Sequence, residues 1–214
     1  MIKERLKRGS VFYKLYLIYH LFIRYKIFFR KRKSFSQFGE DLFIQNFFKN
    51  KKGGKYVDLG AFHPMRLNNT YLLYKRGWSG TNIDLNQVSI DMFNLVRKRD
   101  VNICSLISDE EGAEKTAYFE NDWSAGNTTV LDKNILKVVK GQKKMKSRTF
   151  GNLINHNFYF LNIDLEGHDY SVLKTIDLNK FTPELICIEI LEKSTSKAKI
   201  FNYMKKNNYN FTKQ

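Results

Sequence analysis

Short apolar runs that alternate with helical patterns constrain the fold of this chain more than any other feature of its sequence. The expected strands cover residues 55–60, 81–85, 101–108, 158–165 and 184–190, and the expected helices cover 36–48, 69–77, 87–98, 169–176 and 198–206. Strands that alternate with helices of about ten residues form βαβ units and a mostly parallel sheet. Right-handed crossovers make this sheet doubly wound. The sequence therefore predicts an α/β domain, which we place at residues 34–214.

Three finer expectations concern the elements of this domain. Residues 115–121 alternate apolar and polar side chains and are expected to pair back on a neighbouring strand. Residues 121–148 are polar and include the run KVVKGQKKMKSR, which is expected to be a mobile surface excursion. The helix at 36–48 is expected to present one face, formed by Leu42, Phe43, Asn46 and Phe47.

The first 33 residues form a segment with its own composition, which we expect to be helical. They carry eleven lysines and arginines and one glutamate, whereas the rest of the chain carries 26 basic and 20 acidic side chains. Because the charge is concentrated here and is not spread along a groove, nucleic acid is not the expected partner. Charged residues interrupt the apolar run at 11–29, so it is not an uninterrupted membrane span. Two interpretations stay open: peripheral contact with an anionic membrane, or packing on the domain or a partner subunit.

Acids and glycines at the ends of the expected strands mark the candidate binding site. In a doubly wound sheet, ligands bind beyond the carboxyl ends of the strands. Asp58 ends the first strand, and Gly60 after it permits close approach of the backbone to a ligand. Asp84 ends the next strand, 24 residues after Gly60, where an acid can bind the hydroxyls of a ribose. The alternative is that Asp84 caps the helix that begins near Gln87.

The loop after the first strand limits the choice of cofactor. A dinucleotide needs a G-x-G-x-x-G loop for its pyrophosphate, but the loop here reads GAFHPM, with one glycine followed by bulky residues. The chain also lacks the G-x-x-x-x-G-K-[ST] pattern that holds nucleotide phosphates. S-adenosylmethionine has a ribose and an adenine but no phosphate, and its amino-acid end needs an acid and backbone N–H groups. Asp58, Gly60 and Ala61 are expected to supply these groups.

Six stretches of the sequence occur in an order typical of one family. They are SQFGEDLF, YVDLGAFHP, NNTYLLYKRGWSGTNIDLN, SLISDEEG, LNIDLEGHDYSVL and PELICIEI, between about residues 34 and 190. In these stretches the chain resembles the FkbM family of S-adenosylmethionine-dependent methyltransferases. The resemblance implies a Rossmann-like class I methyltransferase sheet and O-methylation of a hydroxyl on a sugar, glycan or natural product. Residues 1–33 lie outside the resemblance. The run YNFTK at 209–213 is expected to begin the penultimate strand of the family sheet, so the usual last antiparallel strand is expected to be missing.

The central buried strand ends in the sequence NIDLEGHD, which supplies the candidate catalytic residues Asp164, Glu166 and His168. His63, after the first strand, is a fourth candidate. A carboxylate or imidazole at these strand ends can align an acceptor oxygen and remove its proton. The alternatives are that His168 bonds locally at a helix start and that His63 only shapes the pocket. A rival interpretation makes Asp164, Glu166 and His168 metal ligands, whereas the favoured interpretation assigns no metal.

The remaining cofactor contacts are predicted at the starts of two helices and the ends of two strands. They are Gln37, Glu40, Asn69, Thr70, Ser108, Asp109 and Asp164. Gln37 and Glu40 are expected to fold over the methionine end of the cofactor. Asn69 and Thr70 are expected to offer N–H groups to the cofactor's carboxylate. The alternative at both helix starts is simple capping, with Ser36 as the N-cap of the first.

Three functions from different classes stay open on this sequence. The first is methylation of a hydroxyl on a small molecule or glycan. The second is methylation of nucleic acid, against which the chain lacks an Asn- or Asp-Pro-Pro-aromatic turn at its central strand. The third is a non-catalytic, membrane-associated module. Cys104 and Cys187 lie in apolar runs and are expected to be reduced, so we expect a cytoplasmic protein, peripheral at the inner face of the membrane if residues 1–33 bind lipid.

Overall fold

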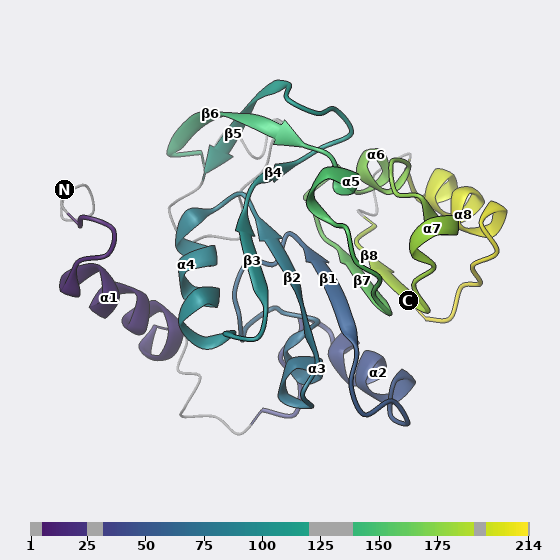
Figure 1. Cartoon of the computed structure of the whole chain (residues 1–214), viewed down its shortest axis with the longest axis horizontal. Coiled ribbons are helices and arrows are strands. Elements are labelled where there is room, and N and C mark those ends of the chain that lie inside the picture. The colour runs from purple at the N-terminus through teal and green to yellow at the C-terminus, as the bar shows by residue number, and fades with distance from the viewer. Residues whose placement is uncertain (1–5, 25–31, 120–138, 191–195, 214) are drawn as a thin grey trace.

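A parallel sheet forms the centre of the computed structural model, which describes residues 6–24, 32–119, 139–190 and 196–213. Its five strands lie in the order β3-β2-β1-β7-β8 (Figure 1). They are β1 (Lys55–Leu59), β2 (Ser79–Asp84), β3 (Val101–Cys104), β7 (Phe160–Ile163) and β8 (Leu185–Ile188). Each coincides with a predicted apolar run, and all neighbours are parallel. The α/β, doubly wound prediction is confirmed.

Helices cover both faces of this sheet. They are α2 (Glu40–Phe47), α3 (Tyr71–Lys75), α4 (Gln87–Val96), α5 (Phe150–Leu153), α6 (Asp169–Leu173), α7 (Leu178–Phe181) and α8 (Ser196–Lys206), whereas α1 (Val11–Ile18) packs on α4. Neighbouring residues of a strand point to opposite faces. Tyr56 of β1 therefore packs in a cluster with residues of α2 and α3, whereas Val57 packs with residues of α5 to α8. The helices α5 and α7 were not predicted.

The sheet changes its direction of winding between β1 and β7. Strands β2 and β3 follow one another on one side of β1, and β7 and β8 lie on its other side. Asp58 in β1 stands opposite Asn82 of β2 and Asn162 of β7. In doubly wound sheets such a reversal opens a crevice at the carboxyl ends of the two central strands, and ligands bind there.

A small second sheet, in the order β4-β6-β5, corrects two predictions. The strand expected at 101–108 is divided at Ser105, because β4 (Leu106–Ile107) leaves the central sheet and pairs with β6 (Gly141–Arg148). The prediction of an excursion was wrong for residues 141–148, which pair antiparallel with β5 (Glu114–Phe119). Most side chains of β6 are exposed, so backbone bonds hold a strand that has no apolar pattern. Residues 120–138 lie outside the described residues.

The predicted face of helix α2 was wrong. Leu42 and Phe47 are exposed, whereas Asp41, Ile44 and Phe48 are buried. The Asp41 carboxylate accepts hydrogen bonds from the hydroxyls of Ser34 and Ser36 and from the N–H of Phe35. The cost of burying a carboxylate makes such partners necessary. This network turns the helix so that Ile44 and Phe48, and not Leu42, pack on the sheet.

The N-terminal helix packs on the domain, which agrees with one of its two interpretations. Helix α1 continues into a π-helical turn, η2 (Tyr19–Ile23), and lies beside α4 (Figure 1). Tyr13, Leu17 and Leu21 are buried there in a cluster with Met65 and Met92. Residues 25–31 lie outside the described residues. In the described part of the chain, no helix is both long enough and apolar enough to cross a membrane.

The strand expected at YNFTK is not present in the structure. Residues 209–213 have no regular structure and line a cavity beside β8. The Tyr209 hydroxyl donates to the carbonyl oxygen of Pro183 at 2.7 Å, and the Tyr209 ring packs against the core formed by α5 to α8. This anchor directs the segment into the cavity and away from a strand position along β8.

Candidate active site

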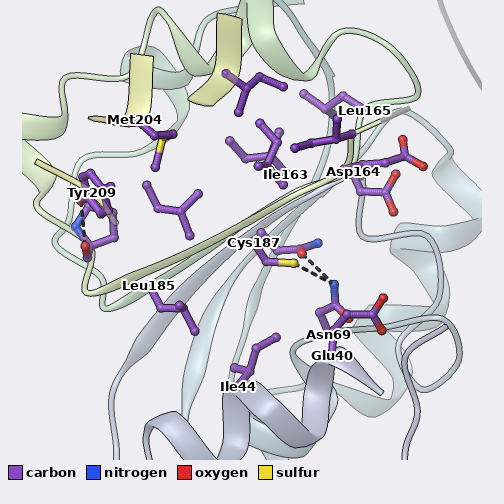
Figure 2. Close-up of a pocket in the computed structure, with 18 of the residues that line it drawn as sticks. Glu40, Ile44, Asn69, Ile163, Asp164, Leu165, Leu185, Cys187, Met204 and Tyr209 are labelled. Carbon is purple, nitrogen blue, oxygen red and sulfur yellow. Dashed lines mark hydrogen bonds between the residues drawn. The ribbon is translucent and has the colours of Figure 1, made fainter. Parts of the chain in front are cut away.

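An open cavity of about 1470 Å³ lies at the carboxyl ends of β1, β2 and β7, at the reversal of the sheet, and continues along the length of β8. Figure 2 shows that its two ends differ in chemistry. Asp164 and Asn69 lie at a polar end, whereas Leu185, Met204 and Tyr209 lie at an apolar end. The cavity is large enough for more than one small molecule, since typical ligand pockets measure roughly 300–1,000 Å³.

Gly60 brings the ends of β1 and β7 together at this cavity. Its φ is 77°, and a Cβ at this position would collide with the carbonyl oxygen of Asp164. The N–H of Asp164 donates to Leu59 at 3.0 Å, which fixes the same approach. The N–H groups of Gly60 and Ala61, which we predicted to bind the cofactor, both donate to the carbonyl of Ile83, at 2.9 and 3.1 Å. Gly60 lines the cavity, but these two N–H groups already have partners.

Asp84, at the end of β2, lines the cavity as expected for a ribose ligand. Its carboxylate accepts the N–H of Phe62 at 2.8 Å and the N–H of Asn86 at 2.7 Å. The N-cap of α4 is Asn86, which accepts the N–H of Val88 at 2.9 Å, so the capping alternative for Asp84 was wrong. Burial raises the pKa of Asp84 to about 6. Each carboxylate oxygen keeps a second lone pair, so Asp84 can also accept hydroxyl groups of a ligand.

Asp58 does not line the cavity and belongs to a hydrogen-bond network behind it. Its carboxylate accepts from Asn162 at 2.8 Å, from the Thr70 hydroxyl at 2.9 Å and from Asn68 at 3.2 Å. Burial raises the pKa of Asp58, and these three donors oppose that rise. The structure therefore places Asp58 and Thr70 in the frame that joins β1, β7 and the start of α3, and not in the predicted contacts with the cofactor.

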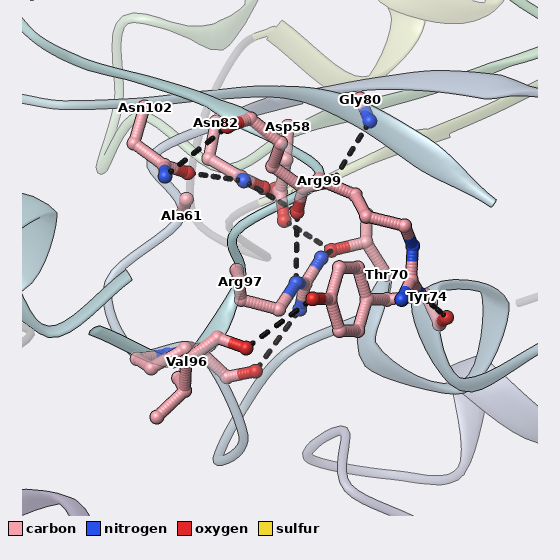
Figure 3. A network of polar contacts seen from close by, with 12 residues as sticks. Asp58, Ala61, Thr70, Tyr74, Gly80, Asn82, Val96, Arg97, Arg99 and Asn102 are labelled. Carbon is pink, nitrogen blue, oxygen red and sulfur yellow. Dashed lines mark hydrogen bonds and ion pairs between the residues drawn. The ribbon is translucent and has the colours of Figure 1, made fainter. Parts of the chain in front are cut away.

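Arg97 lies fully buried at the centre of the same network (Figure 3). Its guanidinium forms an ion pair with Asp100 at 2.8 Å and donates to the hydroxyls of Tyr56 at 2.6 Å and Thr70 at 3.0 Å. A further bond, of 3.0 Å, goes to the carbonyl oxygen of Pro64 in the loop after β1. Asp100 in turn accepts from the backbone N–H of Gly80. Arg97 thus connects the loop that follows β1 to the frame of the sheet.

The acids that follow β7 and β8 form the polar end of the cavity. Asp164 follows β7, and Glu189 follows β8 with its N–H bonded to Ile163 at 2.9 Å. Burial raises the pKa of Asp164, and the nearby carboxylate of Glu189 raises it further. Burial also raises the pKa of Glu189, and burial beside Asp164 raises that of Glu166 to about 7. Asp164 is exposed to water in the cavity, which screens part of the repulsion.

Asp169 shapes the loop that carries these acids. It is buried, and its carboxylate accepts the N–H of Leu165 at 2.8 Å and the N–H of Gly167 at 3.1 Å. His168 occupies the N-cap position of α6 without a side-chain capping bond. It lines the cavity, and its Nε2 atom is buried and has no hydrogen-bond partner within the described residues. Burial lowers the pKa of His168, which favours the neutral ring, and a neutral ring has one nitrogen that can accept a hydrogen bond.

Three other predicted cofactor residues also line the cavity. Gln37 and Glu40 lie at the start of α2, where Glu40 accepts the N–H of Phe38 at 2.8 Å. Ser36 bonds the N–H groups of this helix start, as the capping alternative proposed, although the N-cap residue is Gly39. Asn69 donates to Asn162 at 2.9 Å and, in a longer contact of 3.7 Å, to the sulfur of Cys187 (Figure 2).

His63, Ser108 and Asp109 lie away from the cavity. His63 is buried near His20 of the N-terminal helix, and burial lowers its pKa to about 3. Its neighbour Phe62 lines the cavity but His63 does not, so the structure argues against His63 as the base. Ser108 donates to Asp109 at 3.0 Å in the turn after β4. The break at Ser105 carries both residues out of the central sheet.

The parts of the cavity that the predicted site leaves out include Glu189, residues 105–107 and Cys187. Glu189 ends an apolar strand, the same signal that identified Asp84 and Asp164, and it should have been included. Residues 105–107 line the cavity because the strand breaks there, and no sequence signal marks that break. In the described residues, no group of three or more His, Cys, Asp or Glu side chains is placed to hold a metal ion.

A parallel sheet with its cavity at the β1–β7 reversal, and with an acid at the end of β2, is typical of a Rossmann-like, doubly wound fold. The crystal structure of methyltransferase FkbM from Methylobacillus flagellatus KT has a similar fold, with a TM-score of 0.51 and 16% sequence identity. The similarity covers 72% of this chain but only 37% of that one.

The sequence comparison identifies the family. The model of the methyltransferase FkbM domain matches residues 37–211, and the chain belongs to this family. No curated protein matches the chain. The family match begins after the basic N-terminal segment, as the resemblance implied.

Proposed function

We propose that this protein is an S-adenosylmethionine-dependent methyltransferase that methylates a hydroxyl group of a sugar, glycan or natural product. The observation that carries the proposal is the group of carboxyl side chains that line the cavity. Asp84, Asp164 and Glu189 line it, and burial raises all three pKa values. No described lysine or arginine forms an ion pair with any of the three. A cation in the cavity would relieve this repulsion.

The chemistry of these residues fits S-adenosylmethionine better than a phosphate-bearing cofactor. Its sulfonium and ammonium groups are positive, whereas the phosphates of a dinucleotide or of nucleic acid would be repelled here. Asp84 would hold the ribose hydroxyls, and Glu40, Asn69 and Asp164 would bind the amino-acid end. When bound, this cofactor supplies an electrophilic methyl group on its sulfonium sulfur.

The chain's own task is then to place an acceptor hydroxyl and to remove its proton. Asp164 and Glu189 are both able to accept that proton once one of them is ionised. The raised pKa values suit a base that works near neutral pH, because such a base holds the proton more tightly than an ordinary carboxylate does. The free Nε2 of His168 would orient the acceptor hydroxyl or take the proton in their place. The free, half-buried thiols of Cys104 and Cys187 suit a reducing compartment, and we assign the protein to the cytoplasm.

Calorimetry with S-adenosylmethionine at pH 7 tests this proposal. A bound cation lowers the pKa of nearby carboxyl groups, so binding should release protons. The measured heat should therefore differ between phosphate and Tris buffers, which have different ionisation enthalpies. NAD⁺ and ATP should give no binding heat. Absence of S-adenosylmethionine binding, or a heat that is the same in both buffers, would contradict the proposal. The acceptor class is tested by the transfer of a labelled methyl group to glycan and small-molecule fractions of a lysate.

A further inference from the structure

The outer face of the N-terminal helix exposes large apolar side chains to solvent. Between 43% and 72% of the surface of each of these residues is exposed: Val11, Phe12, Leu15, Ile18, Tyr19 and Ile23. They follow one another around a single side of α1 and η2. Scattered exposed apolar residues are normal on a protein surface, but a contiguous group marks an interaction site. We name this group the outer face.

The opposite side of the same helix is fixed to the domain. Tyr13 and Leu17 are buried against Met92 of α4. The Tyr13 hydroxyl donates to Asp91 at 2.8 Å, and Arg8 forms an ion pair with Asp91 at 2.6 Å. The outer face is therefore held in one orientation. It is also no part of the family domain, whose match begins at residue 37.

Positive charge surrounds the outer face. Lys7, Lys14 and Arg24 are exposed next to it. The whole segment 1–33 carries eleven basic residues and one acidic residue. Aromatic and aliphatic side chains flanked by lysine and arginine are typical of helices that lie in the plane of an anionic membrane surface. In such helices the basic side chains contact the headgroups and the apolar side chains enter the acyl boundary.

We propose that the outer face binds the surface of an anionic lipid bilayer, with α1 lying in the interface plane. Charge decides between this partner and a second copy of the chain. Two outer faces in contact would bring two strongly basic segments together, and like charges in an interface oppose association. An anionic leaflet, in contrast, attracts the basic segment of each chain. The interaction is independent of the proposed methyl transfer, because it uses no residue of the cavity.

Vesicle co-sedimentation of the full chain tests this proposal. Vesicles of phosphatidylglycerol and phosphatidylcholine are compared with vesicles of phosphatidylcholine alone. We expect binding to the anionic vesicles that weakens as salt rises and little binding to the neutral ones. The double variant Phe12→Ser with Tyr19→Ser should bind at least about tenfold more weakly, since burying one aromatic side chain contributes that much. Both side chains are exposed, so the variant should fold normally.

Matched variants separate the outer face from general surface effects. Val101 is 58% exposed on β3, so Val101→Ser is the apolar control and should bind like the wild type. Replacing Lys7 and Lys14 by Gln should weaken binding by about 25-fold, because each basic residue near the leaflet contributes about a factor of five. The same change at the exposed Lys52 and Lys98 should have a smaller effect.

Three results would overturn the proposal. The first is an absence of binding to anionic vesicles at low salt. The second is equal binding by the wild type and the Phe12→Ser with Tyr19→Ser variant. The third is a wild-type dimer in light scattering that this variant converts to a monomer, which would identify the outer face as a contact between copies of the chain.

Discussion

Replacement of Asp84 by Asn examines the cofactor site at its best-defined residue. The two carboxylate oxygens of Asp84 accept backbone N–H groups at 2.7 and 2.8 Å and still offer lone pairs to the cavity. A charge-assisted hydrogen bond contributes about 1.5–3 kcal/mol. Loss of one such bond to a ribose hydroxyl should weaken S-adenosylmethionine binding by about 10- to 150-fold, at about 1.4 kcal/mol for each factor of ten.

The same substitution has a cost in stability that must be measured separately. The amide of Asn would direct an N–H₂ group at one of the two backbone N–H groups, which loses a partner. An unsatisfied buried donor costs about 1–3 kcal/mol. Calorimetry at a temperature well below the thermal midpoint of the variant therefore gives the affinity of folded protein. Asp109→Asn is the matched control, because Asp109 was also predicted for this site but lies outside the cavity.

The pH dependence of cofactor binding gives a second measurement on Asp84. The pKa of Asp84 is raised to about 6, so the carboxylate is ionised above that pH and protonated below it. The dissociation constant of the wild type should rise as the pH falls through about 6, whereas that of Asp84→Asn should vary less in this range. Unchanged affinity of a folded Asp84→Asn variant would remove Asp84 from the site and refute the reasoning.

Three further substitutions test the pair of acids Asp164 and Glu189, the close approach of β1 and β7 at Gly60, and the buried network around Arg97. Glu189→Gln should move the acidic limb of kcat/KM to lower pH, because removing the neighbouring carboxylate lowers the raised pKa of Asp164 and the base ionises earlier. Gly60→Ala should reduce the free energy of unfolding by more than the roughly 1–2 kcal/mol of left-handed backbone strain alone, since its Cβ collides with the carbonyl of Asp164. Arg97→Met should cost about 3–5 kcal/mol in urea unfolding, because Asp100 is left buried without its partner.

Two of these substitutions, at Gly60 and Arg97, have a control within the chain. Gly112 has a φ of 71° and open space around the position of a Cβ, so Gly112→Ala measures backbone strain without a collision. Equal losses at Gly60 and Gly112 would contradict the collision argument. Arg99 is exposed, and Arg99→Met should change stability little. A small loss for Arg97→Met, or an acidic limb that does not move in Glu189→Gln, would count against the corresponding account.

Most strands of the central sheet were predictable because they are largely buried and carry apolar residues, although Val101 of β3 is exposed. The failures have local causes. Strand β6 is held by backbone bonds and carries exposed polar side chains, so it shows no apolar pattern. The face of α2 depends on the burial of Asp41, whose partners Ser34, Phe35 and Ser36 precede the helix. A helical pattern cannot show that an acid will be buried by its neighbours.

The candidate site was predictable where a residue directly ends a strand. Asp84 ends β2 and Asp164 directly follows β7, and both line the cavity. Asp58 lies one residue before the end of β1 and points into the frame behind the cavity, because Asn162 and Thr70 hold its carboxylate. His63 depends on the path of a loop, which the sequence does not determine.

A crystal structure of the full chain with S-adenosylhomocysteine, the demethylated cofactor, tests the central claim most directly. The account predicts that the ligand lies at the carboxyl ends of β1, β2 and β7, with its ribose hydroxyls within hydrogen-bond distance of Asp84 and its amino-acid end toward Asp164. A ligand bound outside this cavity, or one whose ribose faces away from Asp84, would contradict the account.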